Sequence, residues 1–289
     1  MELEKYMKIA IGEAETSLRE GNNGFGTVIV KDGKLIASAH DKEDTESDPT
    51  SHAEINAIRE ASRKLGQKLS GCILISTHEP CRMCASAIVR AGITEVAYGY
   101  SIEEAIAQSR KRMDLPCVEI FSKANNAIQI YDGVLKNECS ILYRDDVRKE
   151  IERLRGADDQ KLKELNEDSI RRRIKWFQEN RDRFDFISQD LLDSGYQLLL
   201  ERFRISSDEA PVIHKTDKAI VFHSMNFCPT LEACRILDLD TRYICKKFNE
   251  NSTDTLLKQI DKRLNFSRNY DKLRPYSEYC EESISLPEN

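Results

Sequence analysis

The first 150 residues of this 289-residue chain are predicted to form an α/β sandwich built on a mixed sheet. Two observations indicate this fold. Apolar residues recur at helical spacing in some segments and in short β-rich runs in others, and the two kinds of segment alternate. The first two β-rich runs are joined by the tight turn 31–34 (KDGK), so they form an antiparallel hairpin, and the sheet is not purely parallel.

The expected elements follow in order along the chain. Residues 2–20 show helical spacing that ends at Gly21, and the hairpin strands cover 26–30 and 35–39. A polar loop follows over 41–49. The remaining expected elements are helices over 51–64, 81–91, 102–112 and 134–154, and strands over 72–76, 95–100 and 127–131.

The composition changes after residue 150. Between 151 and 185 charges crowd together and the apolar residues thin to one narrow stripe, which predicts a charged helical connector. This segment holds the basic patch 171–175 (RRRIK). Residues 186–289 are predicted to form a smaller, α-rich or α+β domain that contains four cysteines and has no assigned role. The expected organisation is therefore 1–150, 151–185 and 186–289.

Charge and hydropathy exclude several classes of protein. The formal net charge is −6 and is spread over both halves, so tight binding to a DNA backbone has little support. No apolar run approaches the ~18 residues of a membrane span. The N-terminal residues 1–15 lack the basic start and apolar run of a secretory signal, so a cytoplasmic location is expected. In a reducing compartment, nine cysteines favour metal binding, catalysis or core packing over disulfides.

The strongest signal is a pair of motifs, HAE at 52–54 and PCRMC at 80–84. His52, Cys81 and Cys84 supply three ligands, and a catalytic zinc takes three protein ligands and leaves one position for water. The two cysteines are three residues apart in a helix expected to begin at Pro80, so both sulfurs share one face. The helix N-terminus there stabilises thiolates. Together the motifs match the zinc-deaminase signature H-x-E…P-C-x-x-C.

Glu54 is expected to be the catalytic acid and base rather than a fourth ligand. It takes a proton from the activated water, gives it to a ring nitrogen and then protonates the leaving amine, so that ammonia leaves and a carbonyl remains. Two other interpretations stay open. Cys81 and Cys84 could belong to a structural zinc knuckle, and Ser51 with Glu54 fits a helix capping box.

Residues 1 to about 150 resemble the cytidine and deoxycytidylate deaminase superfamily, most closely its guanine deaminase and tRNA adenosine deaminase branch. The matching segments are 24–33 (GFGTVIVKDG), 48–54 (DPTSHAE), 79–84 (EPCRMC) and 132–139 (DGVLKNEC). The resemblance implies a three-layer sandwich with a mixed five-stranded sheet, one zinc ion per deaminase domain and a homodimer.

The resemblance also implies a substrate ring stacked on the zinc histidine against an apolar wall. Phe25, Val28 and Ala53 are candidates for this wall, although Val28 also fits an ordinary core position. Asp41 stands where relatives carry an asparagine that reads the base edge. An ionised carboxylate only accepts hydrogen bonds, so Asp41 would favour an amino- or diamino-substituted ring, unless it is a solvated loop residue. Asp114 falls where guanine deaminases place a substrate-contacting acid.

The loop 41–48 at the expected mouth carries five acidic residues against one lysine. A polyanion would be repelled there, so a guanine-like base or nucleoside is the favoured substrate. A tRNA adenosine-to-inosine deaminase is the alternative that the basic patch 171–175 keeps open. A ligand sensor on a deaminase fold is the third hypothesis, which the intact zinc ligands and Glu54 disfavour.

Residues 222–281 faintly resemble small cysteine-containing domains of the aminothiazoline-carboxylate hydrolase type, and no residue role is taken from this likeness. Cys228, just before Pro229 at an expected helix start, is a candidate nucleophile. With His223 nearby it is also a candidate for a second metal site. Buried structural cysteines are the alternative. A catalytic second domain would make the enzyme bifunctional; otherwise the domain covers the deaminase mouth or mediates assembly.

Overall fold

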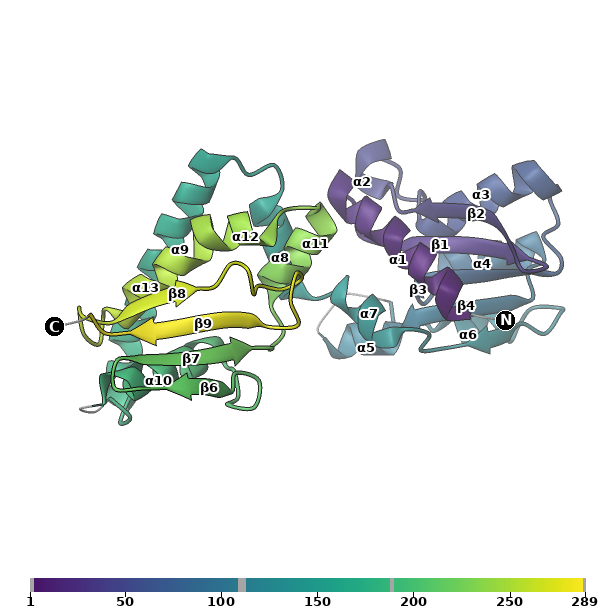
Figure 1. Cartoon of the computed structure of the whole chain (residues 1–289). Helices are drawn as coiled ribbons and strands as arrows, with labels where there is room; N and C mark the ends of the chain where they lie inside the picture. Colours follow the sequence, from purple (N-terminus) through teal and green to yellow (C-terminus); the bar gives the residue numbers. More distant parts are fainter. Residues whose placement is uncertain (1–2, 109–112, 188–189, 288–289) are drawn as a thin grey trace. The chain divides into compact units, whose positions relative to one another are not determined.

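The structure is a computed structural model that describes residues 3–108, 113–187 and 190–287 (Figure 1). The chain forms two compact units, Met1–Lys149 and Glu150–Asn289. No helix in the described ranges is long and apolar enough to cross a membrane.

The first unit contains a mixed five-stranded sheet in the order β2-β1-β3-β4-β5, as the resemblance implied. β1 pairs antiparallel with both β2 and β3, whereas β3, β4 and β5 run parallel. The strands are β1 (Gly26–Lys31), β2 (Lys34–His40), β3 (Cys72–His78), β4 (Glu95–Tyr100) and β5 (Gln129–Tyr131). The helices are α1 (Leu3–Glu20), α2 (Glu43–Glu46), α3 (Ala53–Leu65), α4 (Arg82–Ala91), α5 (Ile102–Ala107), α6 (Cys117–Phe121) and α7 (Lys136–Ile141). The boundary between the units, after Lys149, falls within α8 (Asp145–Leu154).

The helices cover both faces of this sheet, which makes the unit a three-layer sandwich. α1 lies on one face, and α3 and α4 lie on the other (Figure 1). Small residues allow close packing on both sides. Gly26 of β1 lies so close to α1 that a Cβ there would be 1.9 Å from a helix carbonyl oxygen. On the opposite face, alanines such as Ala57 and Ala85 are fully buried against the sheet.

The single helix expected over 134–154 is wrong, because the segment forms α7 and α8 with a turn between them. Leu142 and Tyr143 of this turn are buried. The Tyr143 hydroxyl lies 2.7 Å from Thr77 Oγ1, so it reaches the end of β3. A continuous helix would carry these side chains out of the core. The last four residues of the helix expected over 102–112 lie outside the described residues.

The second unit holds a four-stranded antiparallel sheet, β6-β7-β9-β8, and is therefore of the α+β kind. Its strands are β6 (Val212–Lys215), β7 (Ala219–Ser224), β8 (Asn265–Arg268) and β9 (Cys280–Ser285). Its helices are α9 (Asp159–Asn180), a 3-10 turn η1 (Arg181–Arg183), α10 (Leu191–Phe203), α11 (Pro229–Leu237), α12 (Thr241–Ile244), a π-helical segment η2 (Cys245–Glu250) and α13 (Asn251–Leu257).

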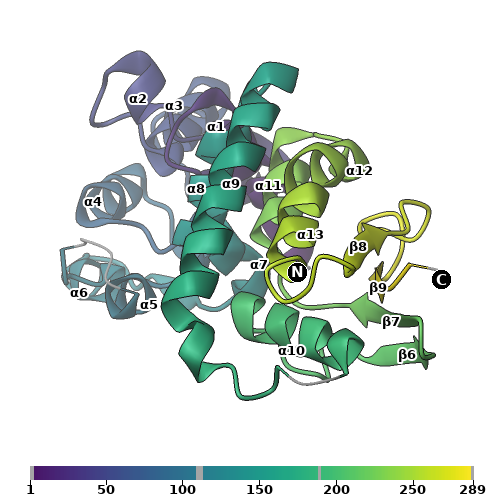
Figure 2. The same ribbon diagram turned by 90° about the vertical axis from the view of Figure 1, so that its left-hand side faces the viewer.

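α9 covers most of the segment expected to be a connector. It lies alongside α13 (Figure 2) and buries Phe177 in the core of the second unit. The narrow apolar stripe of α9 therefore packs within this unit. The boundaries at 151 and 185 stay predictions.

Candidate metal centre and active-site cavity

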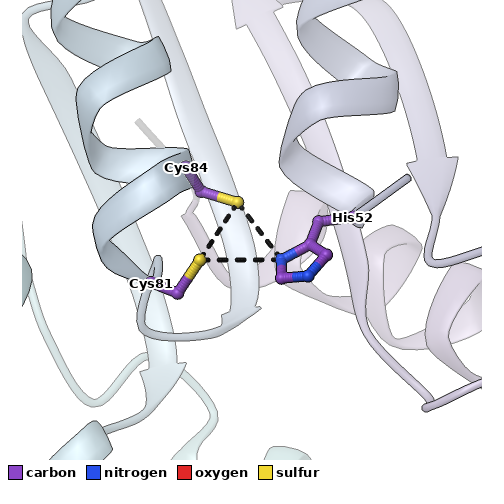
Figure 3. Close-up of side chains that lie close together, drawn as sticks. All are labelled: His52, Cys81 and Cys84. Carbon is purple, nitrogen blue, oxygen red and sulfur yellow. Dashed lines mark hydrogen bonds between the residues drawn. The ribbon is translucent and has the colours of Figure 1, made fainter. Parts of the chain in front are cut away.

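Two helix starts bring the expected metal ligands together in the first unit (Figure 3). His52 is the N-cap residue of α3 and has an extended backbone, and its ring points toward the two cysteine sulfurs. Cys81 is the N-cap residue of α4, also extended, and Cys84 is the third residue of that helix. Pro80 precedes the cap, so it is not the first helical residue as expected. One turn of α4 still places both sulfurs toward His52.

The distances among these three side chains match a tetrahedral zinc site. The Sγ atoms of Cys81 and Cys84 are 3.6 Å apart, and His52 Nδ1 lies 3.6 Å from the first and 3.5 Å from the second. Tetrahedral bonds of about 2.3 Å to sulfur and about 2.0 Å to nitrogen place two sulfurs about 3.8 Å apart and sulfur and nitrogen about 3.5 Å apart. The donors therefore fit zinc without rearrangement.

The charges of the donor groups favour a cation. Hydrogen bonding to Cys84 lowers the pKa of Cys81 to about 3, against the effect of burial. Hydrogen bonding to Cys81 raises the pKa of His52 to about 9, and the hydrogen bond to Cys81 together with burial raises the pKa of Cys84. In the metal-free chain one thiolate therefore lies beside two protonated groups. Binding of a divalent cation displaces those protons.

Glu54 lies next to the metal donors. It is the second residue of α3 and is buried. Its Oε2 accepts a hydrogen bond from the Cys84 thiol at 3.4 Å, and its Oε1 accepts one from the Ser76 hydroxyl at 3.5 Å. Burial, followed by the charge of Cys81, raises the pKa of Glu54 to about 7. A carboxyl that titrates near neutrality is suited to give and take protons.

The capping-box interpretation of Glu54 does not fit this geometry. His52, not Ser51, is the N-cap residue, and no side chain caps the helix. The Ser51 hydroxyl instead donates to Glu46 Oε2 at 2.7 Å. Glu54 is therefore available for chemistry in the cavity.

A cavity of about 600 Å³ opens onto the metal donors and Glu54. Among the described residues that line it, four side chains are carboxylates and one is a guanidinium, so this part of its wall is acidic. Its lining residues are Asn23, Phe25, Glu43, Asp44, Pro49, His52, Glu54, His78, Glu79, Cys81, Arg82, Met83, Ile102, Met113 and Leu115. Most of the residues outside the two motifs, such as Asn23 and Ile102, are not predicted by the sequence, because they come from loops, helices and a strand that are far apart along the chain.

One wall of the cavity is aromatic. Phe25 stacks on Tyr143 at 5.3 Å between ring centres, and the His78 ring meets Phe25 edge-on at 5.5 Å. Tyr100 completes this four-ring group behind the wall. His78 Nδ1 lies 2.9 Å from the carbonyl oxygen of Glu79, which can only accept, so we assign the proton to Nδ1 and an acceptor lone pair to Nε2.

Of the three candidates for the apolar wall, one lines the cavity and two do not. Phe25 lines the cavity. Val28 is fully buried in β1, within the sheet, and is not among the lining residues. Ala53 is also fully buried, between the two site residues of α3. Asp114 is exposed and does not line the cavity, although its neighbours Met113 and Leu115 do.

Asp41 lies behind the cavity wall rather than on it. It is fully buried, and its Oδ1 accepts hydrogen bonds from the backbone amides of Asn23 at 3.3 Å and Glu43 at 3.4 Å. Its Oδ2 is buried without a hydrogen-bond partner in the described part of the chain, and burial raises the pKa of Asp41. Donor atoms of Asp41, Glu43 and His52 lie within 4.8 Å of one another. Asn23, Glu43 and Asp44, rather than Asp41, thus line the cavity in this region.

Cys228 and His223, the candidates for a nucleophile or a second metal site, lie in the second unit and have different surroundings. Cys228 is the N-cap residue of α11. His223 stacks on Tyr279 at 3.5 Å between ring centres and lies 3.2 Å from Glu281 Oε2. The metal-capable groups found among the described residues lie in the first unit. A role for Cys228 or His223 stays a prediction.

The chain is similar to known proteins over its first half. Residues 1–100 match the model of the cytidine and deoxycytidylate deaminase zinc-binding region. The chain is 38% identical over 137 residues to a tRNA-specific adenosine deaminase of Bacillus subtilis (strain 168), covering 47% of this chain and 83% of that protein. It is 44% identical over 100 residues to the guanine deaminase of the same organism, covering 34% of this chain and 64% of the relative. A solved structure of Bacillus subtilis guanine deaminase shares 35% identity and covers 44% of this chain and 78% of its own, with a TM-score of 0.36.

Proposed function

The chain belongs to the cytidine and deoxycytidylate deaminase zinc-binding family, and from this premise we propose that its first unit is a hydrolytic deaminase of a small aminated heterocycle. In this reaction water adds to the amine-bearing ring carbon, ammonia leaves and a carbonyl remains. The observation that carries the proposal is the triangle of His52, Cys81 and Cys84 with the buried carboxyl of Glu54 beside it, all in one cavity.

Each residue has a distinct task in this proposal. His52, Cys81 and Cys84 hold the zinc ion, which when bound acts as a Lewis acid and lowers the pKa of water. Glu54 takes the proton that the water loses and delivers it to a ring nitrogen. Glu54 then takes the proton of the hydroxyl group that has added to the ring carbon and gives it to the departing amine, which leaves a carbonyl, so its raised pKa serves both transfers. The aromatic wall of Phe25 and His78 offers a surface on which a planar ring can stack.

A small, uncharged, purine-like base or nucleoside is the proposed substrate. The cavity wall carries Glu43 and Asp44 together with two further carboxylates, and Arg82 is the one arginine or lysine among the described residues that line it. Such a wall repels phosphates and favours ring edges rich in N–H donors.

The second candidate is deamination of adenosine in tRNA. It is favoured by one observation, the 38% identity to a tRNA-specific adenosine deaminase over 83% of that relative. The acidic wall of the cavity is the observation against it.

Ammonia release from the zinc-loaded full chain tests the first candidate. The panel contains guanine, adenine, cytosine, their nucleosides, aminated triazines and pterins. We expect release from one free ring or nucleoside, its loss after chelation and its return with zinc. Silence across the panel from protein that holds one zinc per chain would overturn the small-molecule proposal.

A second assay separates the two candidates. Inosine formation in a tRNA transcript, measured by mass spectrometry of its nucleosides, supports the tRNA candidate if it is faster than release from every free ring. Binding of the same transcript should then weaken steeply with salt. Zinc-dependent turnover of a free ring with no inosine formed supports the first candidate.

Two expectations from the sequence stay predictions under this proposal. The homodimer is tested by light scattering of the purified chain, and the cytoplasmic location by cell fractionation.

A further inference from the structure

One nitrogen of the His52 ring faces the two cysteine sulfurs, and the other lies near an acidic side chain. Nδ1 lies 3.6 Å from Cys81 Sγ and 3.5 Å from Cys84 Sγ (Figure 3), so Nδ1 is the atom placed to bind a metal. Nε2 lies 3.8 Å from Glu43 Oε2. A neutral imidazole that binds a metal through Nδ1 carries its proton on Nε2. That N–H requires an acceptor, and Glu43 is placed to supply one.

Glu43 belongs to an anchored segment that lines the same cavity. It is the first residue of α2, and the backbone amide of Thr45 in this helix donates to Asn22 Oδ1 at 2.9 Å. The side chain of Glu43 is 39% exposed, so it has room to turn. The distance of 3.8 Å to His52 is that of an ion pair, and a movement of about 1 Å shortens it to a hydrogen bond.

Asn23 also holds the carboxylate of Glu43. Its Nδ2 donates to Glu43 Oε2 at 3.3 Å and to Asp41 Oδ1 at 3.5 Å. These two contacts fix the orientation of the amide, because the flipped amide would set its oxygen against two carboxylates. Glu43 Oε2 therefore lies within reach of two donors, the amide of Asn23 and the ring N–H of His52.

Asn23 is fixed in turn by two contacts to its backbone. Asp41 Oδ1 accepts from the backbone amide of Asn23 at 3.3 Å, and Arg148 Nη1 donates to its carbonyl oxygen at 3.1 Å. Asp41 is fully buried, so this anchor is part of the packed interior. A chain of contacts thus runs from Asp41 through Asn23 and Glu43 to His52.

A carboxylate beside the outer nitrogen of a metal-binding histidine affects the metal in two ways. It fixes the orientation and the tautomer of the ring, and it makes the bound nitrogen a stronger donor. Loss of such a partner typically weakens metal binding by about 10–100-fold. Asp44, the next residue of α2, lines the same cavity, but no hydrogen bond or ion pair joins it to His52 in the part of the chain that the structure describes.

We propose that Glu43 is a positioning residue of the metal centre, which accepts a hydrogen bond from His52 Nε2 and is itself held by Asn23. This inference rests on the proposed deaminase function, because it assigns a partner to one of the zinc ligands of that function. The role of Glu43 is separate from the proton transfers of Glu54.

The zinc dissociation constant of the full chain tests this role without any substrate. It is measured by competition with a chelator of known affinity. Glu43→Ala should raise the Kd roughly tenfold or more. Glu43→Gln should recover part of the loss, because its amide oxygen still accepts a hydrogen bond. Asp44→Ala is the matched control: it removes the same charge from the same helix, and it should change the Kd less than roughly threefold, since solvent and salt screen a charge that makes no direct contact.

A second measurement observes the hydrogen bond itself. Nuclear magnetic resonance of the zinc-loaded chain, labelled with ¹⁵N-histidine, detects a ring N–H that exchanges slowly with water. The signal of His52 is recognised because it depends on zinc. We expect this signal in the wild type and in Asp44→Ala, and we expect Glu43→Ala to lose it to fast exchange.

Equal zinc dissociation constants for the wild type and Glu43→Ala would overturn the role of Glu43 and leave the deaminase proposal intact. An equal loss of affinity in Glu43→Ala and Asp44→Ala would also overturn it, since the effect would then be one of overall charge. If zinc-free Glu43→Ala melts below the wild type, the wild-type resonance decides, and its absence refutes the hydrogen bond. A wild-type chain that binds no zinc would overturn both proposals.

Discussion

Replacing Glu54 by Gln removes the proposed proton carrier and keeps the shape of the side chain. Of the four carboxylates on the cavity wall, Glu54 is the one that accepts from a metal-donor thiol, at 3.4 Å. Glu79 cannot substitute for it, because its two oxygens accept from the backbone amides of Cys117 at 2.7 Å and Ile102 at 2.8 Å. The lost proton transfer should therefore not be taken over by a neighbour.

We expect Glu54→Gln to lower kcat by about 10²–10⁴-fold, the usual worth of a positioned acid–base group. This corresponds to about 2.7–5.4 kcal/mol in the activation barrier, at 1.36 kcal/mol for each factor of ten. Zinc content should stay at one per chain, because the three donors do not include Glu54.

The assay measures ammonia release on the substrate identified from the panel, together with zinc by mass spectrometry. Glu60→Gln is the matched control: it makes the same chemical change on the same helix, where Glu60 pairs with Lys64 instead of facing the cavity. Turnover within tenfold of the wild type would refute the role of Glu54. Loss of zinc together with activity would show that Glu54 is a ligand.

Three further predictions concern stability. Gly26→Ala should destabilise the first unit by about 3 kcal/mol, because the new Cβ would lie 1.9 Å from a backbone oxygen of α1. Gly12→Ala should instead stabilise α1 by about 1 kcal/mol, because a Cβ at Gly12 would meet no atom within 4 Å. Hydrogen exchange of the first unit measures both changes in free energy. His40 lies 2.7 Å from Glu13 and 3.0 Å from Glu20, and the hydrogen bond to Glu13 raises the pKa of His40 above 6.5. The stability that protonated His40 contributes is therefore complete below pH 6.5 and is lost as the pH rises through the pKa of His40 in the folded chain. A difference in unfolding free energy between the wild type and His40→Gln that grows with pH would contradict this. Chelation should lower the melting temperature of the first unit, since a metal at 100 times its Kd adds about 2.7 kcal/mol to the free energy of unfolding. An unchanged melting curve would argue against a bound ion.

The chemistry of the metal centre follows from local sequence. Cys81 and Cys84 fall on one turn because they are three residues apart, and a helix start offers unpaired amide donors wherever it lies in a fold. His52 and Glu54 likewise share one helix start. Short spacings of this kind are set by backbone geometry, so they can be interpreted without knowledge of the tertiary structure.

Other features depend on contacts between distant segments. The turn at Leu142 and Tyr143 interrupts a pattern that fits one helix, because Tyr143 packs against Phe25 and reaches Thr77. Asp41 belongs to a segment whose acidic composition predicts a solvated loop, yet Asp41 itself is fully buried behind Asn23 and Glu43. Neither outcome can be inferred from neighbours in sequence.

By itself, the sequence predicted the alternating elements of the first unit, the antiparallel hairpin that makes its sheet mixed, and the two motifs that carry the candidate metal donors and Glu54, since each of these signals lies within a short segment. Only the tertiary structure decided which side chains line the cavity and that Tyr143 packs against Phe25 and reaches Thr77. These residues come from segments tens of residues apart. Their meeting depends on which buried surfaces pack together, and that choice is a property of the whole chain.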